Sequence, residues 1–132
     1  MLVRKILVVD DELEILDLVG IELTTEGYEV QKARGGQAAI AQALAWQPDL
    51  VLMDALMPGM NGADTVKVMK ADDRTKAIPV IFLSTISAHK EGGQECQKIN
   101  VDNHWYEAIA KPFEHDELLE AIHRTLKALK RY

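Results

Sequence analysis

Short hydrophobic runs alternate with amphipathic stretches along the whole chain. The runs at residues 5–10, 50–54, 78–83 and 107–110, with a weaker one at 28–33, predict five strands that are mostly too apolar to have a solvent-facing side. Apolar residues at helical spacing predict helices over residues 12–26, 37–46, 63–71 and 114–130. Strands that alternate with helices in this way form a parallel sheet with helices on both faces, so the pattern predicts a doubly wound α/β fold with a five-stranded sheet.

One stretch, residues 87–106, has no clear pattern. Gly92 and Gly93 interrupt any helix there, and we expect only a short helix around Gln94–Lys98, followed by a loop over residues 100–103. The chain contains no internal repeat, linker or low-complexity segment. Its 132 residues are enough for one hydrophobic core and too few for two, so residues 1–132 are predicted to form a single domain.

Composition narrows the classes of function. The formal net charge of −6 argues against nonspecific binding to nucleic acids or anionic membranes, because both depend on clustered positive charge. No apolar run approaches the roughly 20 residues of a membrane helix, and the first residues lack the pattern of a signal peptide. The single cysteine, Cys96, cannot form an internal disulfide and is typical of a reducing compartment. We therefore expect a cytoplasmic protein that contacts neither nucleic acid nor membrane directly.

Polar residues follow the predicted strands at the point where each strand ends. Asp10 and Asp11 follow the first strand and Asp54 ends the third, while Ser84 and Lys111 follow the fourth and fifth. The carboxyl ends of parallel strands meet at one edge of the sheet, where ligands bind in open α/β folds. Three carboxylates gathered there would repel one another unless a cation joined them. Their hard oxygen atoms favour Mg²⁺.

These residues and their neighbours carry a resemblance. The matching segments are Val8-Val9-Asp10-Asp11-Glu12, then Asp54 with Met57-Pro58 and Gly62, then Ser84 after a strand, and finally Lys111-Pro112-Phe113. In this order the chain resembles, over essentially its full length, a receiver domain of a two-component response regulator. The resemblance implies a flavodoxin-like sheet with strand order 2-1-3-4-5.

The resemblance also implies a chemistry. Asp54 would accept a phosphoryl group from the phosphohistidine of a sensor histidine kinase or a histidine phosphotransfer protein. Mg²⁺ would be held by Asp10, Asp11 and Asp54, together with the backbone carbonyl of Leu56. The domain would catalyse only its own phosphorylation and dephosphorylation, and it is therefore expected to be a signalling module and not an enzyme.

Two further residues complete the implied site. Lys111 would contact a phosphoryl oxygen, with a cis peptide bond between Lys111 and Pro112. Ser84 would donate a hydrogen bond to the phosphoryl group and move inward on phosphorylation, which would change the binding of a downstream protein target.

The chain departs from the family pattern in the region that usually reports phosphorylation. Receivers carry an aromatic residue three positions before the lysine, where this chain has Ala108, and Trp105 and Tyr106 are both candidates to replace it. The interval between Ser84 and Lys111 is also longer than usual. The alternative to a standard receiver is therefore a receiver-like module with an altered or phosphorylation-independent output face.

A second departure concerns the lifetime of the phosphorylated state. The apolar residues Leu56 and Ile86 flank the predicted phosphoryl site, and Thr85 is bulkier than the residue often found there. Since such side chains would obstruct the attacking water, we expect the phosphoryl group to persist for many minutes or more.

Other interpretations fit the residues less well. Asp11 with Glu14 matches a helix capping box, a structural role that is compatible with metal binding. An aspartyl phosphatase would need an Asp-x-Asp spacing that neither acidic segment provides, and a flavin carrier would need a first loop without carboxylates. The sequence leaves open the cognate kinase, the target, whether the chain is a stand-alone regulator or an excised domain, and whether it forms a homodimer.

Overall fold

The computed structural model describes residues 3–84 and 97–129. Its strands are β1 (Lys5–Val9), β2 (Glu29–Ala33), β3 (Leu50–Asp54), β4 (Val80–Ser84), β5 (Gln97–Val101) and β6 (His104–Ala110). Its helices are α1 (Leu13–Thr25), α2 (Gly36–Trp46), α3 (Gly62–Ala71) and α4 (His115–Leu129). All nine predicted strands and helices outside the unclear stretch are therefore present, with ends shifted by one or two residues at most sites.

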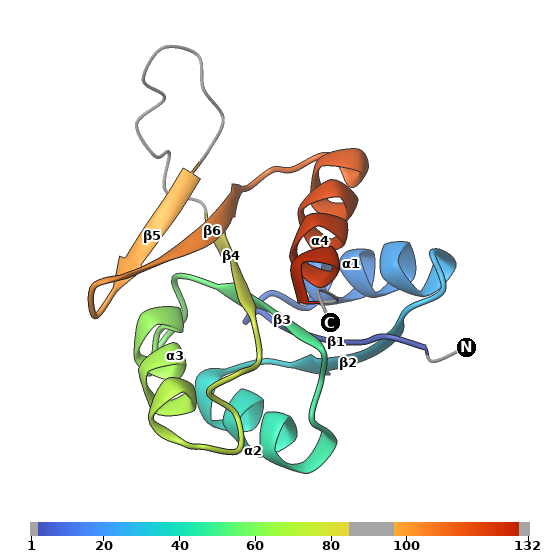
Figure 1. Ribbon diagram of the computed structural model, residues 1–132. Coiled ribbons are helices and arrows are strands. Elements are labelled where there is room, and N and C mark those ends of the chain that lie inside the picture. The colour runs from blue at the N-terminus through green and yellow to red at the C-terminus, as the bar shows by residue number, and fades with distance from the viewer. Residues whose placement is uncertain (1–2, 85–96, 130–132) are drawn as a thin grey trace.

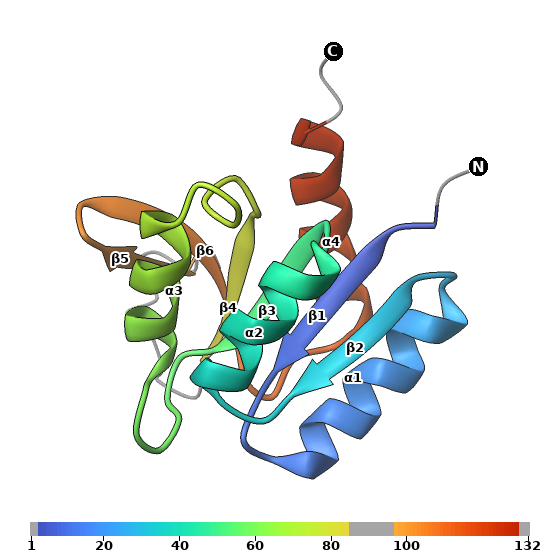
Figure 2. The same ribbon diagram turned by 90° about the horizontal axis from the view of Figure 1, so that it is seen from below.

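The strands form one six-stranded sheet in the order β2-β1-β3-β4-β6-β5. The first five strands in this order run parallel, while β5 pairs antiparallel with β6. Helices α1 and α4 cover one face of the sheet and α2 and α3 cover the other (Figures 1 and 2). The doubly wound α/β fold predicted from the sequence and the strand order implied by the resemblance are thus confirmed, with one strand more than predicted.

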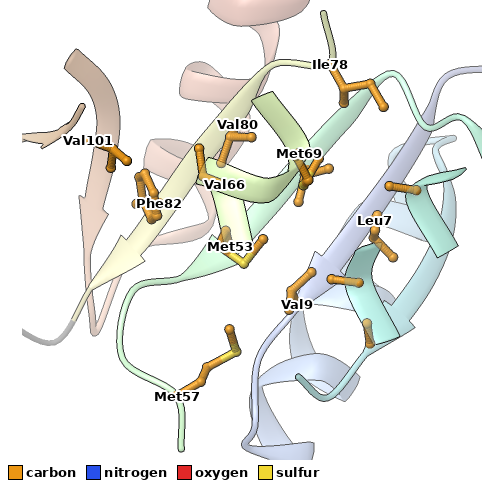
Figure 3. Close-up of a cluster of buried hydrophobic side chains, with 14 of the residues drawn as sticks. Leu7, Val9, Met53, Met57, Val66, Met69, Ile78, Val80, Phe82 and Val101 are labelled. Atoms are coloured by element: carbon orange, nitrogen blue, oxygen red, sulfur yellow. The ribbon is translucent and has the colours of Figure 1, made fainter. Parts of the chain in front are cut away.

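The two faces of the sheet bury two separate hydrophobic clusters. One cluster packs Leu7, Val9, Met53 and Phe82 against the inward sides of α2 and α3 (Figure 3). The other packs Ile6, Val8 and neighbouring strand residues against α1 and α4. Successive residues of β1 therefore point into opposite clusters, which explains why the strand is apolar throughout.

The unclear stretch differs from its predicted structure. Of the short helix expected around Gln94–Lys98, residues 94–96 lie outside the described part of the chain, and Gln97 and Lys98 belong to β5, so the helix prediction is wrong for those two residues. The loop predicted over residues 100–103 is likewise wrong at its start, because residues 100 and 101 belong to β5.

The turn between β5 and β6 explains this difference. Asp102 and Asn103 have φ values of 50° and 67°, the left-handed conformation that two-residue hairpin turns require and that these two residue types tolerate. The Asn100 side chain accepts a hydrogen bond from the backbone N–H of Asn103 at 3.2 Å. The result is a hairpin whose second strand, β6, begins three residues before the strand predicted at 107–110.

Within the described residues, no helix is both long and apolar enough to cross a membrane.

Candidate functional site

The sheet brings the predicted site residues to one edge. Met53 lies beside Val9 in the ladder, Asp54 beside Leu83, and Ser84 beside Ala110. The residues that follow β1 and β6 therefore lie next to the last residues of β3 and β4. A backbone hydrogen bond holds Lys111 beside the end of β4, since the Lys111 N–H donates to the Ser84 carbonyl at 2.7 Å.

Three carboxylates gather at this edge. Asp10, Asp11 and Asp54 each offer an oxygen atom within 4.8 Å of the others. Asp10 is fully buried and Asp54 is 3% exposed, whereas Asp11 is only partly buried. Hard oxygen donors with one partly exposed member fit Mg²⁺, which prefers carboxylate ligands and retains several waters.

Lys111 lies among these acids. Its ammonium is 2.6 Å from an Asp10 oxygen and 3.4 Å from an Asp54 oxygen. The peptide bond between Lys111 and Pro112 is cis, as the resemblance implied. Burial alone would lower the pKa of Lys111, but the hydrogen bond to Asp10 and the charge of Asp54 raise it above its usual value. The side chain is therefore cationic at neutral pH.

The electrostatics of Asp54 reflect the crowding of negative charge. Burial and then the neighbouring charge of Asp10 raise the pKa of the Asp54 carboxyl to about 7, although the Lys111 ammonium lowers it. The Leu56 backbone N–H donates to Asp54 at 3.3 Å, which favours the ionised form. One lysine does not fully compensate two buried carboxylates, so a cation bound here would lower the pKa of Asp54.

Gly62 has a structural reason to be glycine. A Cβ atom at this position would lie 2.4 Å from the Asp54 carbonyl oxygen and 3.1 Å from the ring of Phe82. The adjacent Asn61 begins α3, and its side chain accepts the N–H of Asp64 at 2.8 Å. The loop that joins Asp54 to α3 is therefore packed directly against the backbone of Asp54.

The capping box predicted for Asp11 and Glu14 is not formed. The residue at the N-cap of α1 is Glu12, and no side chain caps the helix. Instead, the Asp10 side chain accepts the backbone N–H of Glu12 at 2.9 Å. The buried carboxylate thus orders the start of the helix, which leaves Asp11 without a capping role.

Two residues near the site were given no role by sequence reasoning. Glu12 lies 3.8 Å from the Lys111 ammonium, and Arg34 donates a hydrogen bond to the Asp11 carbonyl at 3.4 Å. The position of Arg34 directly after β2 was the available signal, because the carboxyl end of β2 lies at the same edge of the sheet. Thr85 and Ile86 lie outside the described residues.

The aromatic residues before Lys111 occupy different environments. Trp105 is 66% exposed. Tyr106 lies on the same face of β6 as the buried Ala108, and its ring meets that of Phe82 edge-on, with 5.7 Å between the centroids. Of the two candidates for the missing switch aromatic, Tyr106 is the one in contact with the core.

Comparisons with known proteins agree with this geometry. The response regulator receiver domain family matches residues 6–123. The DNA-binding dual master transcriptional regulator RpaA of Synechocystis is 34% identical over 96% of this chain, which spans 51% of that protein. The chain therefore spans about half the length of this curated relative.

Solved structures agree as well. The chemotaxis protein CheY4 of Vibrio cholerae has a TM-score of 0.80 at 28% identity and covers 93% of this chain and 98% of its own. A second neighbour is the receiver domain of the sensor histidine kinase PA1611 of Pseudomonas aeruginosa, which was solved with a magnesium ion in its active-site cleft. It has the same fold, with a TM-score of 0.80 at 24% identity, and the match covers 96% of this chain and 99% of that one. The chain belongs to the response regulator receiver domain family of two-component signal transduction.

Proposed function

We propose that the domain accepts a phosphoryl group on Asp54 from the phosphohistidine of a sensor histidine kinase or a histidine phosphotransfer protein. The observation that carries this proposal is the convergence of Asp10, Asp11 and Asp54 within 4.8 Å, with the Lys111 ammonium in contact with two of them. The partners follow from the family, since receiver domains act in two-component systems. The cytoplasmic location stays a prediction from the single cysteine.

In the proposed reaction an Asp54 oxygen attacks phosphorus and forms a P–O bond while the P–N bond of the phosphohistidine breaks. The electron pair leaves with the imidazole nitrogen of the donor. Lys111 contacts a phosphoryl oxygen, and in doing so it moves its charge from Asp10 toward the new anion. Ser84, 3% exposed at the end of β4, donates a hydrogen bond to the phosphoryl group.

Mg²⁺ would be held by Asp10, Asp11 and Asp54, with the Leu56 carbonyl as a further ligand. When bound, it supplies positive charge that neutralises the carboxylates and the incoming phosphoryl oxygens. Asp11 is the partly exposed member of this set, whereas Asp10 and Asp54 are buried.

Intact mass spectrometry tests the proposal directly. The protein is incubated with acetyl phosphate or phosphoramidate in the presence of Mg²⁺ or of EDTA. We expect one phosphoryl group per chain with Mg²⁺, none with EDTA, and none for Asp54→Asn. Asp73→Asn, which removes an exposed carboxyl in the loop after α3, is the matched control and should be labelled like the wild type. Labelling of Asp54→Asn at the wild-type rate would refute the assignment of the nucleophile.

A specific observation favours a second candidate function, a receiver-like module whose output face is altered or does not respond to phosphorylation. β5 covers the edge of β6 beside Ala108, the position at which the family carries its switch aromatic. If this candidate is correct, beryllofluoride with Mg²⁺ will shift amide signals near Asp54 and leave those of Tyr106 and Ala108 unchanged. Shifts at both places would support the phosphorylation-dependent output.

A further inference from the structure

The described sheet ends in β5, a strand with one side unpaired. Its inner side pairs with β6, and β5 stands last in the strand order (Figure 1). A strand in this position presents backbone N–H and C=O groups that can pair with a further strand.

The register of the hairpin identifies these groups. The two-residue turn makes Val101 and His104 the closing pair, and such a pair exchanges backbone hydrogen bonds. Since hydrogen-bonded residues alternate along an antiparallel ladder, Ile99 and Gln97 also bond to β6. The backbone groups of Lys98 and Asn100 consequently point away from β6, toward the outer side of the hairpin.

We propose that β5 pairs antiparallel with β5 of a second copy of this chain, about a two-fold axis at Ile99. This register overlaps all five residues of the strand. It places Lys98 opposite Asn100 of the second copy, and both residues have outward backbone groups. Moving the two-fold axis by one residue, to Lys98 or to Asn100, would pair only three of the five described residues of each strand.

Side chains on the α3 side of the hairpin match in this register. Ile99 is partly buried and packs with Tyr106 against the hydrophobic cluster under α2 and α3. Pairing about Ile99 brings the Ile99 side chains of the two copies together, so an apolar row runs from Tyr106 of one copy to Tyr106 of the other. Apolar cross-strand pairs of this kind stabilise a sheet.

On the opposite side of the hairpin this register avoids a contact between like charges. Lys98 is the only charged residue of β5 and is exposed. It faces the amide of Asn100, whereas a register centred on Lys98 would place two ammonium groups directly opposite each other. The exposed Trp105 lies across from Asn100 on β6, one strand away from the second copy's Lys98. This self-complementarity favours a second copy as the occupant.

The association should be weak. A pairing of five residues buries less than the roughly 1,200 Å² typical of stable interfaces. Each copy also carries a net charge of −6, and the resulting repulsion is screened by salt. Dimer formation should therefore rise with protein concentration and with ionic strength. The proposed pairing does not depend on phosphorylation, and every test uses unphosphorylated protein.

Cysteine cross-linking tests the register. In a Cys96→Ser background, Ile99→Cys places the two thiols in a non-hydrogen-bonded cross-strand pair, whose short Cα separation suits a disulfide. Lys98→Cys is the matched control, because its thiol would face Asn100 and not itself. Lys98 is the more exposed of the two, so random collision favours the control. We expect the Ile99→Cys dimer to form about tenfold faster under mild oxidation. Equal rates, or a faster Lys98→Cys dimer, would overturn the proposal.

Sedimentation velocity tests the backbone pairing. Asn100→Pro removes an outward N–H, and Asn100→Ala keeps it, while both lose the side-chain bond to Asn103. We expect concentration-dependent dimers for the wild type and Asn100→Ala, and monomers for Asn100→Pro. A wild type that stays monomeric up to about millimolar concentration, or identical behaviour of the two variants, would overturn the proposal. If circular dichroism shows that Asn100→Pro does not fold, the comparison of Ile99→Cys with Lys98→Cys tests the proposal by itself.

Discussion

Asp54 is the residue at which the requirements of the site and of the fold conflict. Its carboxyl is 3% exposed and lies near the charge of Asp10, and these two causes raise its pKa to about 7. An unfolded chain would ionise the same group near 3.8. Between these pH values the folded state binds more protons than the unfolded state, so the free energy of unfolding falls as pH rises. Above about pH 7 the full destabilisation is present.

Asp54→Asn should therefore stabilise the protein in the absence of metal. We expect the free energy of unfolding to rise by about 1–3 kcal/mol at about pH 8 and to change little below about pH 3, because the wild-type carboxyl is then mostly neutral in both states. Urea unfolding at several pH values measures this. Asp73→Asn, at an exposed carboxyl, should show no comparable gain. A destabilised Asp54→Asn at pH 8 would mean that the contact with Lys111 outweighs the repulsion.

Gly62→Ala tests the packing against the backbone of Asp54. The new Cβ would lie 2.4 Å from the Asp54 carbonyl oxygen, and a backbone atom cannot yield as a flexible side chain does. We expect a loss of about 1–3 kcal/mol in the free energy of unfolding, together with slower phosphorylation.

Gly35→Ala is the matched control for this change. A Cβ atom at Gly35 would have no other atom within 4 Å, and the backbone there is extended, a conformation that alanine adopts freely. Gly35 is the N-cap residue of α2, where alanine is less favourable than glycine, so we expect a cost of no more than about 1 kcal/mol, without the steric term at Gly62. Equal costs for the two substitutions would show that glycine at position 62 is not required by the contact with Asp54.

Leu56 should govern how long the phosphoryl group persists. Leu56 follows Asp54 by two residues, and its side chain is 52% exposed. Because this side chain is apolar, it cannot form a hydrogen bond with an attacking water. We expect a wild-type lifetime of many minutes or more, shortened several-fold in Leu56→Asn. Val68→Asn, a similar change at an exposed residue of α3, should leave the lifetime unchanged. Loss of the wild-type label within seconds would contradict the prediction.

At the scale of elements, His115 joins α1 to α4. Its two ring nitrogens lie 3.2 Å from Glu22 and 3.5 Å from Glu26, at the end of α1. The Glu22 carboxylate, followed by Glu26, raises the pKa of the His115 imidazole above its usual 6.5. The imidazolium therefore stabilises the folded state fully below pH 6.5, and this contribution is lost as pH rises through the folded-state pKa.

His115→Gln should remove this pH dependence. Relative to the wild type, the variant should unfold at a lower urea concentration at about pH 6 and at a similar concentration at about pH 9. His104→Gln, at an exposed residue of β6 with no carboxylate partner among the described ion pairs, is the control. A constant difference between His115→Gln and the wild type at both pH values would indicate lost packing and not lost charge.

The elements also show where sequence patterns were sufficient. β1, β3 and β4 are buried on both faces, and their continuous apolar runs predicted them directly. β5 has only five residues, three of them polar, and follows a stretch without periodicity, so the sequence predicted a helix over its first two residues and a loop over its last two. The Asp102-Asn103 pair was the available hairpin signal, although it is weaker than a turn with glycine.

At the scale of the whole molecule, metal binding and folding should be coupled. The three carboxylates that would hold Mg²⁺ lie at the ends of β1 and β3, which are far apart in the sequence. Only the folded chain brings them together. A ligand that binds only the folded state stabilises it by mass action. At a Mg²⁺ concentration of about 100 times the dissociation constant, we expect about 2.7 kcal/mol.

Asp11→Asn should abolish most of this stabilisation. Asp17→Asn, which removes an exposed carboxyl of α1 that pairs with Lys32, should retain it. Thermal unfolding with Mg²⁺ and with EDTA measures the difference. If Mg²⁺ stabilises Asp11→Asn as strongly as the wild type, the metal binds elsewhere.

The sequence by itself determined the alternation of strands and helices, the doubly wound fold and the identity of the chemical groups at the strand ends. These features depend on local periodicity and on residues that immediately follow apolar runs, and both can be read along the chain. Asp10, Asp11, Asp54, Ser84 and Lys111 could be proposed together because parallel strands bring their carboxyl ends to one edge.

Only the tertiary structure decided how those groups meet. The short contact of Lys111 with Asp10, the approach of Arg34 to Asp11 and the packing of Gly62 against Asp54 all join residues from different elements. The antiparallel addition of β5 belongs here too, because the pairing of a weakly patterned strand depends on the partner it meets. Distances between side chains are properties of packing, and packing is established only when distant segments are brought together.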